Sequence, residues 1–169
     1  QRHDNVINRV CVTGQHREML DQVLELFNIE PDYDLKIMRP GQTPTEVAAR
    51  VMLELDPLLR DLRPDWTLVQ GDTTTVMAAA IASRHLKIKV GHVEAGLRTG
   101  DMHNPFPEEM NRVVTDAISD LRFAPTNQAR LNLLGEGYAE ESIIVTGNTV
   151  IDALLTVAQR PWQPEPEHP

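Results

Sequence analysis

The sequence has few of the residues that build disulfide frameworks, aromatic-rich cores or membrane spans. Cys11 is the only cysteine among 169 residues, which excludes an internal disulfide and with it a secreted cystine scaffold. Aromatic residues make up only 4% of the chain, so its interior must be built mainly from aliphatic side chains. No apolar run is long enough to span a bilayer, and no charged-then-apolar signal segment stands at the start. We therefore expect a cytoplasmic protein without a membrane partner.

An excess of positive charge is also missing. The chain has 16 lysines and arginines against 25 acidic residues, a formal net charge of -9. A surface that neutralises nucleic-acid phosphates needs the opposite balance, so nucleic acid is not an expected partner. A small phosphate-bearing molecule is still compatible, because one or two arginines in a pocket suffice to bind it. The six histidines are scattered without metal-ligand spacing, and we expect no metal site.

The sequence does contain a regular alternation of β-branched runs and amphipathic stretches. This pattern predicts strands at 9–14, 34–38, 66–71, 89–94, 121–124 and 142–146, and helices at 16–27, 43–62, 72–85, 107–120, 127–134 and 149–159. Thr43-Pro44-Thr45-Glu46 is typical of a helix start, and Pro57 predicts a kink or break near Asp56. The alternation indicates parallel βαβ units, and so an α/β protein with a doubly wound, Rossmann-like sheet.

Acidic residues follow the ends of two predicted strands and open a later helix. Asp72 comes after the strand at 66–71, Glu94 ends the strand at 89–94, and Glu108 follows Pro107. Ligands of such sheets bind beyond the carboxyl ends of the strands, so these side chains are expected in one crevice. Carboxylates gathered there repel one another, and burial disfavours their charged forms. Either effect raises a pKa toward neutrality, as acid–base catalysis requires.

Each of these acids also has a purely structural explanation. Asp72 is well placed to cap the following helix, and an acid at Glu108 is favoured by the helix dipole. Glu94 is harder to explain structurally, because an unpaired carboxylate at the end of an apolar strand is costly. Arg98 and Arg112 either clamp a phosphate or sugar oxygen or simply pair with these acids.

Other catalytic motifs are incomplete. His92-Val93-Glu94 matches the H-x-E of zinc deaminases but has no C-x-x-C partner. The chain has neither a G-x-G-x-x-G opening its first βα unit nor a Walker A motif. The turn Gly147-Asn148-Thr149 could bind an anion through backbone N–H groups, although helix capping explains it equally well.

Taken together, five segments resemble the non-hydrolysing UDP-N-acetylglucosamine 2-epimerases. They occur in family-like order and spacing, and the resemblance extends to about residue 158. The run His92 to Asp101, H-V-E-A-G-L-R-T-G-D, is the most specific of them. The five segments are Val10–Leu20, Gly71–Thr75, Gly91–Asp101, Pro107–Arg112 and Thr146–Asp152.

The resemblance implies inversion at C2 of UDP-GlcNAc to give UDP-ManNAc, by elimination and re-addition of UDP, in cell-surface polysaccharide biosynthesis. It places the catalytic carboxylates at Asp72, Glu94 and Glu108, and substrate contacts at Arg112, Arg98, Gln15, His16 and Thr73. Neither a redox cofactor nor a metal is implied, and the full-length enzyme is expected to be a homodimer of two-domain, glycosyltransferase-B-like subunits.

The chain also departs from this family pattern at both ends. The family's first strand, with its loop F-G-T-R-P-E, has no counterpart, so a gap is expected between the strands at 9–14 and 66–71. Residues 1–158 are expected to form a Rossmann-like N-terminal domain and 159–169 a proline-rich linker, without the C-terminal UDP-binding domain. On this view the 169-residue chain alone has little or no turnover. A hydrolysing 2-epimerase that releases ManNAc and UDP, and a non-catalytic nucleotide-sugar-binding fragment, are the alternatives.

Overall fold

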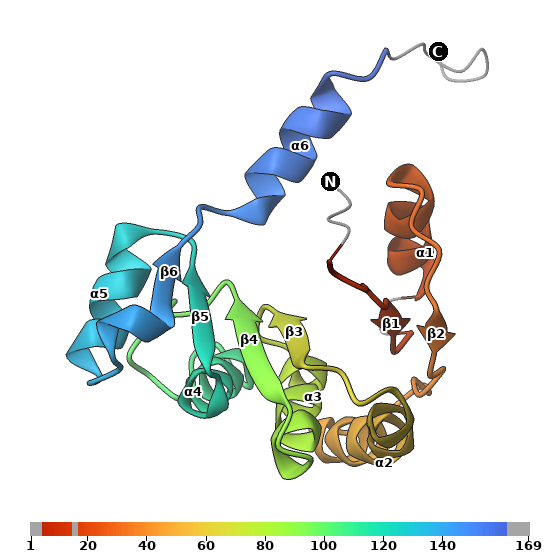
Figure 1. The fold of residues 1–169 in the computed structure, drawn as a ribbon, viewed down its shortest axis with the longest axis horizontal. Coiled ribbons are helices and arrows are strands. Elements are labelled where there is room, and N and C mark those ends of the chain that lie inside the picture. The colour runs from red at the N-terminus through yellow and green to blue at the C-terminus, as the bar shows by residue number, and fades with distance from the viewer. Residues whose placement is uncertain (1–4, 15–16, 162–169) are drawn as a thin grey trace.

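The computed structural model describes residues 5–14 and 17–161, and their strands and helices alternate along the chain (Figure 1). The elements are β1 (Cys11–Val12), α1 (Arg17–Leu26), β2 (Tyr33–Asp34), α2 (Pro44–Leu62), β3 (Trp66–Gln70), α3 (Thr74–His85), β4 (Lys89–Val93), α4 (Glu108–Ile118), β5 (Leu121–Ala124), α5 (Asn127–Gly135), the short 3-10 helix η1 (Glu140–Ser142), β6 (Ile143–Val145) and α6 (Thr149–Ala158). The prediction of an α/β protein is confirmed. The tail at 162–169 lies outside the described residues.

The strands form two separate parallel sheets. The larger sheet has the order β3-β4-β5-β6, so each strand pairs with its successor in the sequence. The smaller sheet contains only β1 and β2. As the expected gap implies, β1 and β3 are not neighbours in one sheet. The predicted strand at 34–38 is wrong in extent: β2 covers Tyr33–Asp34, and Lys36, with a φ of 49°, takes a left-handed conformation that an extended strand cannot contain.

The second helix begins where its sequence predicts but does not break. The Thr43 side chain accepts from the Glu46 N–H at 3.3 Å, while the Glu46 carboxylate accepts from the Thr43 N–H at 2.8 Å. This reciprocal pair is a capping box. The break expected near Asp56 is absent, because α2 continues through Pro57 to Leu62. Pro57 has no N–H to donate to the Leu53 carbonyl, so α2 loses one hydrogen bond there, on a side where Leu53 is exposed.

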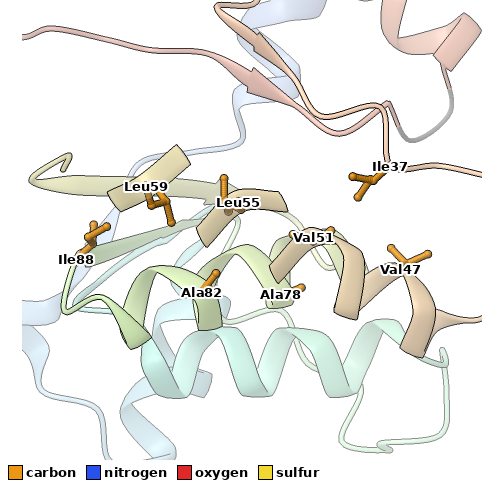
Figure 2. Packing of buried hydrophobic residues seen from close by; sticks show 8 residues of the cluster. All are labelled: Ile37, Val47, Val51, Leu55, Leu59, Ala78, Ala82 and Ile88. Carbon is orange, nitrogen blue, oxygen red and sulfur yellow. The ribbon is translucent and has the colours of Figure 1, made fainter. Parts of the chain in front are cut away.

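The principal apolar core lies between α2 and α3. Figure 2 shows α2 side chains spaced four residues apart in one cluster with side chains of α3 and with Ile88, which precedes β4. Small residues at Ala78 and Ala82 let the two helices pack closely. The residues of this cluster are Ile37, Val47, Val51, Leu55, Leu59, Ala78, Ala82 and Ile88. None of the helices within residues 5–14 and 17–161 is both long and apolar enough to cross a membrane.

Alternation along β4 directs its side chains to two different environments. Val90 and His92 are fully buried, and His92 contacts α4. Gly91 faces the opposite side, where an added Cβ would lie 2.6 Å from Leu68 Cδ2. Helices α3 and α4 pack against each other below the sheet in Figure 1. His92 therefore points into the layer between the sheet and the helices, near the end of β4, which Glu94 follows.

Candidate active site

Two of the three predicted catalytic acids follow neighbouring strands of the large sheet at their carboxyl ends, and the third opens α4. Gln70 and Val93 are paired in register, so the residues that follow β3 and β4 leave the sheet side by side. The Glu94 carboxylate lies 3.8 Å from the position of a Cβ added to Gly71, the neighbour of Asp72. Glu108 is the first residue of α4. The same first part of α4 is tied to the β3–α3 turn, because Asn111 Nδ2 donates to the Asp72 carbonyl at 2.8 Å.

Asp72 does not cap the helix that follows it. The N-cap of α3 is Thr73, whose hydroxyl accepts from the Val76 N–H at 3.3 Å. The structural explanation for Asp72 is therefore wrong, because the next residue already performs the capping. The Asp72 carboxylate instead meets the Arg112 guanidinium, with Nε and Nη2 each 3.0 Å from Oδ2. Thr73 is exposed at this edge, and its predicted contact with substrate stays a prediction.

Glu94 occupies a backbone conformation that costs free energy for any residue with a side chain. Its φ is 74°, in the left-handed region that favours glycine. The conformation is held by hydrogen bonds, since the N–H groups of Glu94 and Ala95 both donate to the Phe123 carbonyl, at 3.0 and 3.1 Å. Gly96 follows at φ 82° and donates its N–H to Asp116 Oδ2 at 3.1 Å. Strained residues fixed this firmly by their surroundings occur preferentially at functional sites.

Arg112 joins Asp72 to a second, buried acid. Its Nη1 contacts Glu109, which is only 2% exposed. The other Glu109 oxygen accepts from the N–H groups of Thr99 and Gly100, at 2.9 and 3.0 Å. Burial raises the pKa of Glu109, but these two N–H groups and the Arg112 charge outweigh it and hold that pKa below its ordinary value. Arg112 is thus oriented toward Asp72 by an ionised acid behind it.

Arg98 is placed differently from Arg112. Its Nε and Nη2 contact the Glu136 carboxylate at 2.6 and 2.8 Å, and Nη2 also lies 2.8 Å from Asp116 Oδ2. Its Nη1 donates to the Leu97 carbonyl at 2.8 Å. Arg98 therefore pairs with acids of the protein, but with Glu136 and Asp116 and not with Asp72, Glu94 or Glu108. A substrate contact would require it to leave them. Gln15 and His16 lie outside the described residues.

Helix α4 buries a polar face, which the sequence did not reveal. Glu109, Asn111, Thr115 and Asp116 are all buried, with exposures of 2% or less. Polar residues at helical spacing usually form a solvated face, so the burial of this one could not be read from the spacing alone. The burial is explained by partners in the β3–α3 turn, on β4 and in the β4–α4 loop. This face of α4 forms a buried hydrogen-bond network that supports the candidate site from below.

His92 and Asp116 form the centre of this hydrogen-bond network. The His92 ring is fully buried, with Nδ1 2.6 Å from Asp116 Oδ1 and Nε2 2.8 Å from the Gly71 carbonyl oxygen. Burial raises the pKa of Asp116, but the His92 hydrogen bond and charge, together with Arg98, outweigh it and lower that pKa. The pair thereby connects α4 to both strand-end turns, the one before Asp72 and the one after Glu94.

The arrangement offers carboxylates for proton transfer and a guanidinium for negative charge. Within residues 5–14 and 17–161, no group of three or more His, Cys, Asp and Glu side chains could hold a metal ion. The hollow of about 620 Å³ lined by Leu59, Lys87 and Lys89 involves the start of β4, the opposite end from Glu94. The strand-end edge is therefore the candidate active site by its chemistry rather than by the size of a cavity.

Comparison with known proteins gives consistent matches over most of the chain. The family model described as UDP-N-acetylglucosamine 2-epimerase matches residues 1–166. The Salmonella typhimurium protein named UDP-N-acetylglucosamine 2-epimerase is 58% identical over 152 residues, which are 90% of this chain and 40% of the relative. The chain thus spans about 40% of the length of such curated relatives.

Solved structures show the same fold. The Neisseria meningitidis UDP-GlcNAc 2-epimerase bound to UDP-GlcNAc superposes with a TM-score of 0.86 at 51% identity, covering 91% of this chain and 42% of that one. The Methanocaldococcus jannaschii UDP-GlcNAc 2-epimerase in complex with UDP-GlcNAc and UDP gives a TM-score of 0.84 at 43% identity, covering 90% of this chain and 42% of that one.

Proposed function

The chain belongs to the UDP-N-acetylglucosamine 2-epimerase family, and on that premise we propose that it supplies the carboxylates for interconversion of UDP-GlcNAc and UDP-ManNAc. In this reaction a base removes the C2 proton while the C1–oxygen bond to UDP breaks, which leaves a 2-acetamidoglucal and UDP. Re-addition of UDP, with a proton delivered to the other face of C2, gives the epimer. The chemistry requires two carboxyl groups on opposite sides of the sugar ring and cationic support for departing UDP.

The conformation of Glu94 carries this proposal. A side chain in the left-handed region at the end of β4, 3.8 Å from the Cβ position of Gly71, is costly, and strain of this kind occurs preferentially at functional sites. Together with Asp72 and Glu108, it gives three carboxylates at the edge where ligands of parallel sheets bind. We assign proton transfer to this trio as a group, and to Arg112 the orientation of Asp72 and contact with the substrate side.

Three further proposals concern the domain division, the cellular location and the oligomeric state. We propose that residues up to 158, where α6 ends, form one Rossmann-like domain of a two-domain subunit. The substrate cleft would then lie between this domain and a second, UDP-binding one. We further propose a cytoplasmic homodimer. Light scattering of the protein as its gene encodes it tests the dimer, and a monomer at micromolar concentration would contradict it.

A product assay with Glu94→Gln tests the proposed function. The protein as its gene encodes it is incubated with UDP-GlcNAc in D₂O, and products are followed by proton NMR. UDP-ManNAc with deuterium at C2 is the expected product, whereas free ManNAc with UDP would identify a hydrolysing enzyme. Glu94→Gln keeps the size of the side chain but cannot exchange a proton, so the rate should fall by about 10²- to 10⁴-fold.

The matched control for this assay is Glu141→Gln. Glu141 is an exposed acid on η1, and the same chemical change there should leave the rate unchanged. If Glu94→Gln retains the wild-type rate, Glu94 takes no part in proton transfer, and the proposal loses the observation that carries it.

A further inference from the structure

The buried ring of His92 lies between two oxygen atoms. Nδ1 is 2.6 Å from Asp116 Oδ1, and Nε2 is 2.8 Å from the Gly71 carbonyl oxygen. Both distances are those of full hydrogen bonds. The three residues belong to β4, α4 and the turn after β3, so the ring bridges three segments at once.

Neither oxygen can donate a proton to the ring. A carbonyl oxygen has only lone pairs, and an ionised carboxylate is likewise only an acceptor. Arg98 Nη2 and the Gly96 N–H both bind the second oxygen of Asp116, at 2.8 and 3.1 Å, and these donors favour the ionised form of its carboxyl group. Both ring nitrogens of His92 must therefore carry hydrogen. A neutral ring would set a bare nitrogen lone pair against an oxygen lone pair in the protein interior.

The ring of His92 lies within a network of charged side chains, one of which contacts it directly. Asp116 faces it directly from α4, and Arg98 approaches the far side of Asp116 while pairing with Glu136. Arg122 on β5 donates to the Asp116 backbone carbonyl at 2.6 and 2.9 Å. The two acids and two arginines of this network balance in charge, so a charged His92 ring is favoured by its direct contact with Asp116 and not by an excess of acids.

The bridge connects the two turns that carry the candidate catalytic acids. Gly71 immediately precedes Asp72, and its N–H also donates to the Val93 carbonyl at 3.1 Å. On the other side, Asp116 holds Gly96, two residues after the strained Glu94. The relative placement of Asp72 and Glu94 therefore depends on bonds that pass through His92 and Asp116.

We propose that His92 is a positioning residue, held by Asp116 as an imidazolium whose two N–H groups fix the Asp72 turn against the Glu94 turn. The inference rests on the proposed function, because positioning matters only if these acids react. His92 does not touch substrate in this account. It acts through Gly71 and, by way of Asp116, through Gly96.

The protonation state is tested without any assay of activity. In the chain labelled with ¹⁵N at histidine, proton-coupled NMR at neutral pH should show a bound proton on both His92 ring nitrogens. The exposed His85 serves as the internal reference, because its ring exchanges freely with water. A His92 ring with one bare nitrogen at neutral pH would overturn the proposal.

Kinetics of His92→Gln and Asp116→Asn test the positioning. Both variants remove the charge while keeping a polar side chain of similar size, and His85→Gln is the matched control on the surface. We expect kcat per folded protein to fall about 10²-fold in each variant, because small misplacements of reacting groups cost that much. KM for UDP-GlcNAc should stay near the wild-type value. The double variant should be no slower than either single one, because both changes remove the same link.

The outcomes separate the two proposals. An inactive wild type whose His92 ring carries both protons means that the proposed function fails while the ion pair stands. An active wild type whose variants lose only folded protein, with kcat per folded molecule unchanged, means that His92 is structural and the positioning role is wrong.

Discussion

Replacing Gly96 by alanine tests how closely the turn after Glu94 packs against α5. Gly96 has a φ of 82°, and a Cβ added there would lie 2.8 Å from Leu133 Cδ1 and closer still to the Ala129 carbonyl oxygen. Ala129 and Leu133 are themselves buried, at 1% and 0% exposure. The substitution therefore forces a residue with a side chain into the left-handed region and at the same time overpacks a closed contact.

The two costs can be estimated separately. Placing an alanine in the left-handed conformation costs about 1–2 kcal/mol. Forcing an extra carbon into a well-packed contact costs about 1–3 kcal/mol, and a helix backbone on the far side yields less readily than a flexible side chain. Gly96→Ala should thus lose about 2–5 kcal/mol, a large part of the roughly 5–15 kcal/mol that stabilises a typical domain.

Urea denaturation followed by circular dichroism measures this loss. Gly137→Ala is the matched control, because Gly137 has a similar φ of 89° but nothing within 4 Å of an added Cβ. It should show only the backbone cost, about 1–2 kcal/mol. The excess loss in Gly96→Ala is the steric cost. If both variants lose equal stability, Gly96 is not required by close approach of α5, and this part of the reasoning is refuted.

Two further predictions concern other supports of the fold. Thr43→Ala removes half of the capping box of α2 and should lower the free energy of unfolding by about 1 kcal/mol, whereas Thr43→Ser should retain it; equal loss in both would contradict a capping role. Glu109 has a folded-state pKa below its ordinary 4.5, so its contribution to stability is complete above pH 4.5 and is lost as pH falls through the folded pKa. Urea midpoints of Glu109→Gln should therefore fall less steeply with acid than those of the wild type, and parallel curves would contradict an ionised, paired Glu109.

Much of the fold follows from local patterns that need no tertiary information. The alternation of β-branched runs and amphipathic helices predicts the order of elements because each pattern has its own period, and the start of α2 follows from Thr43 and Glu46. Pro57 shows where such reasoning fails. A proline removes one helical hydrogen bond and crowds the preceding turn, and whether the helix breaks or continues depends on packing that the local sequence does not record.

The candidate site, like the fold, was predictable from the sequence only in part. The sequence by itself determined which acids follow the strands, because Asp72 and Glu94 occupy the βα junctions of a parallel sheet and Glu108 opens a helix. Only the tertiary structure decided what holds them there. Thr73 rather than Asp72 caps α3, Arg112 reaches Asp72 from α4, and Glu94 adopts a left-handed backbone. The tertiary structure also decided that the polar face of α4 is buried. The partners of its buried charges come from strands and loops far away in the sequence, and no local pattern records them.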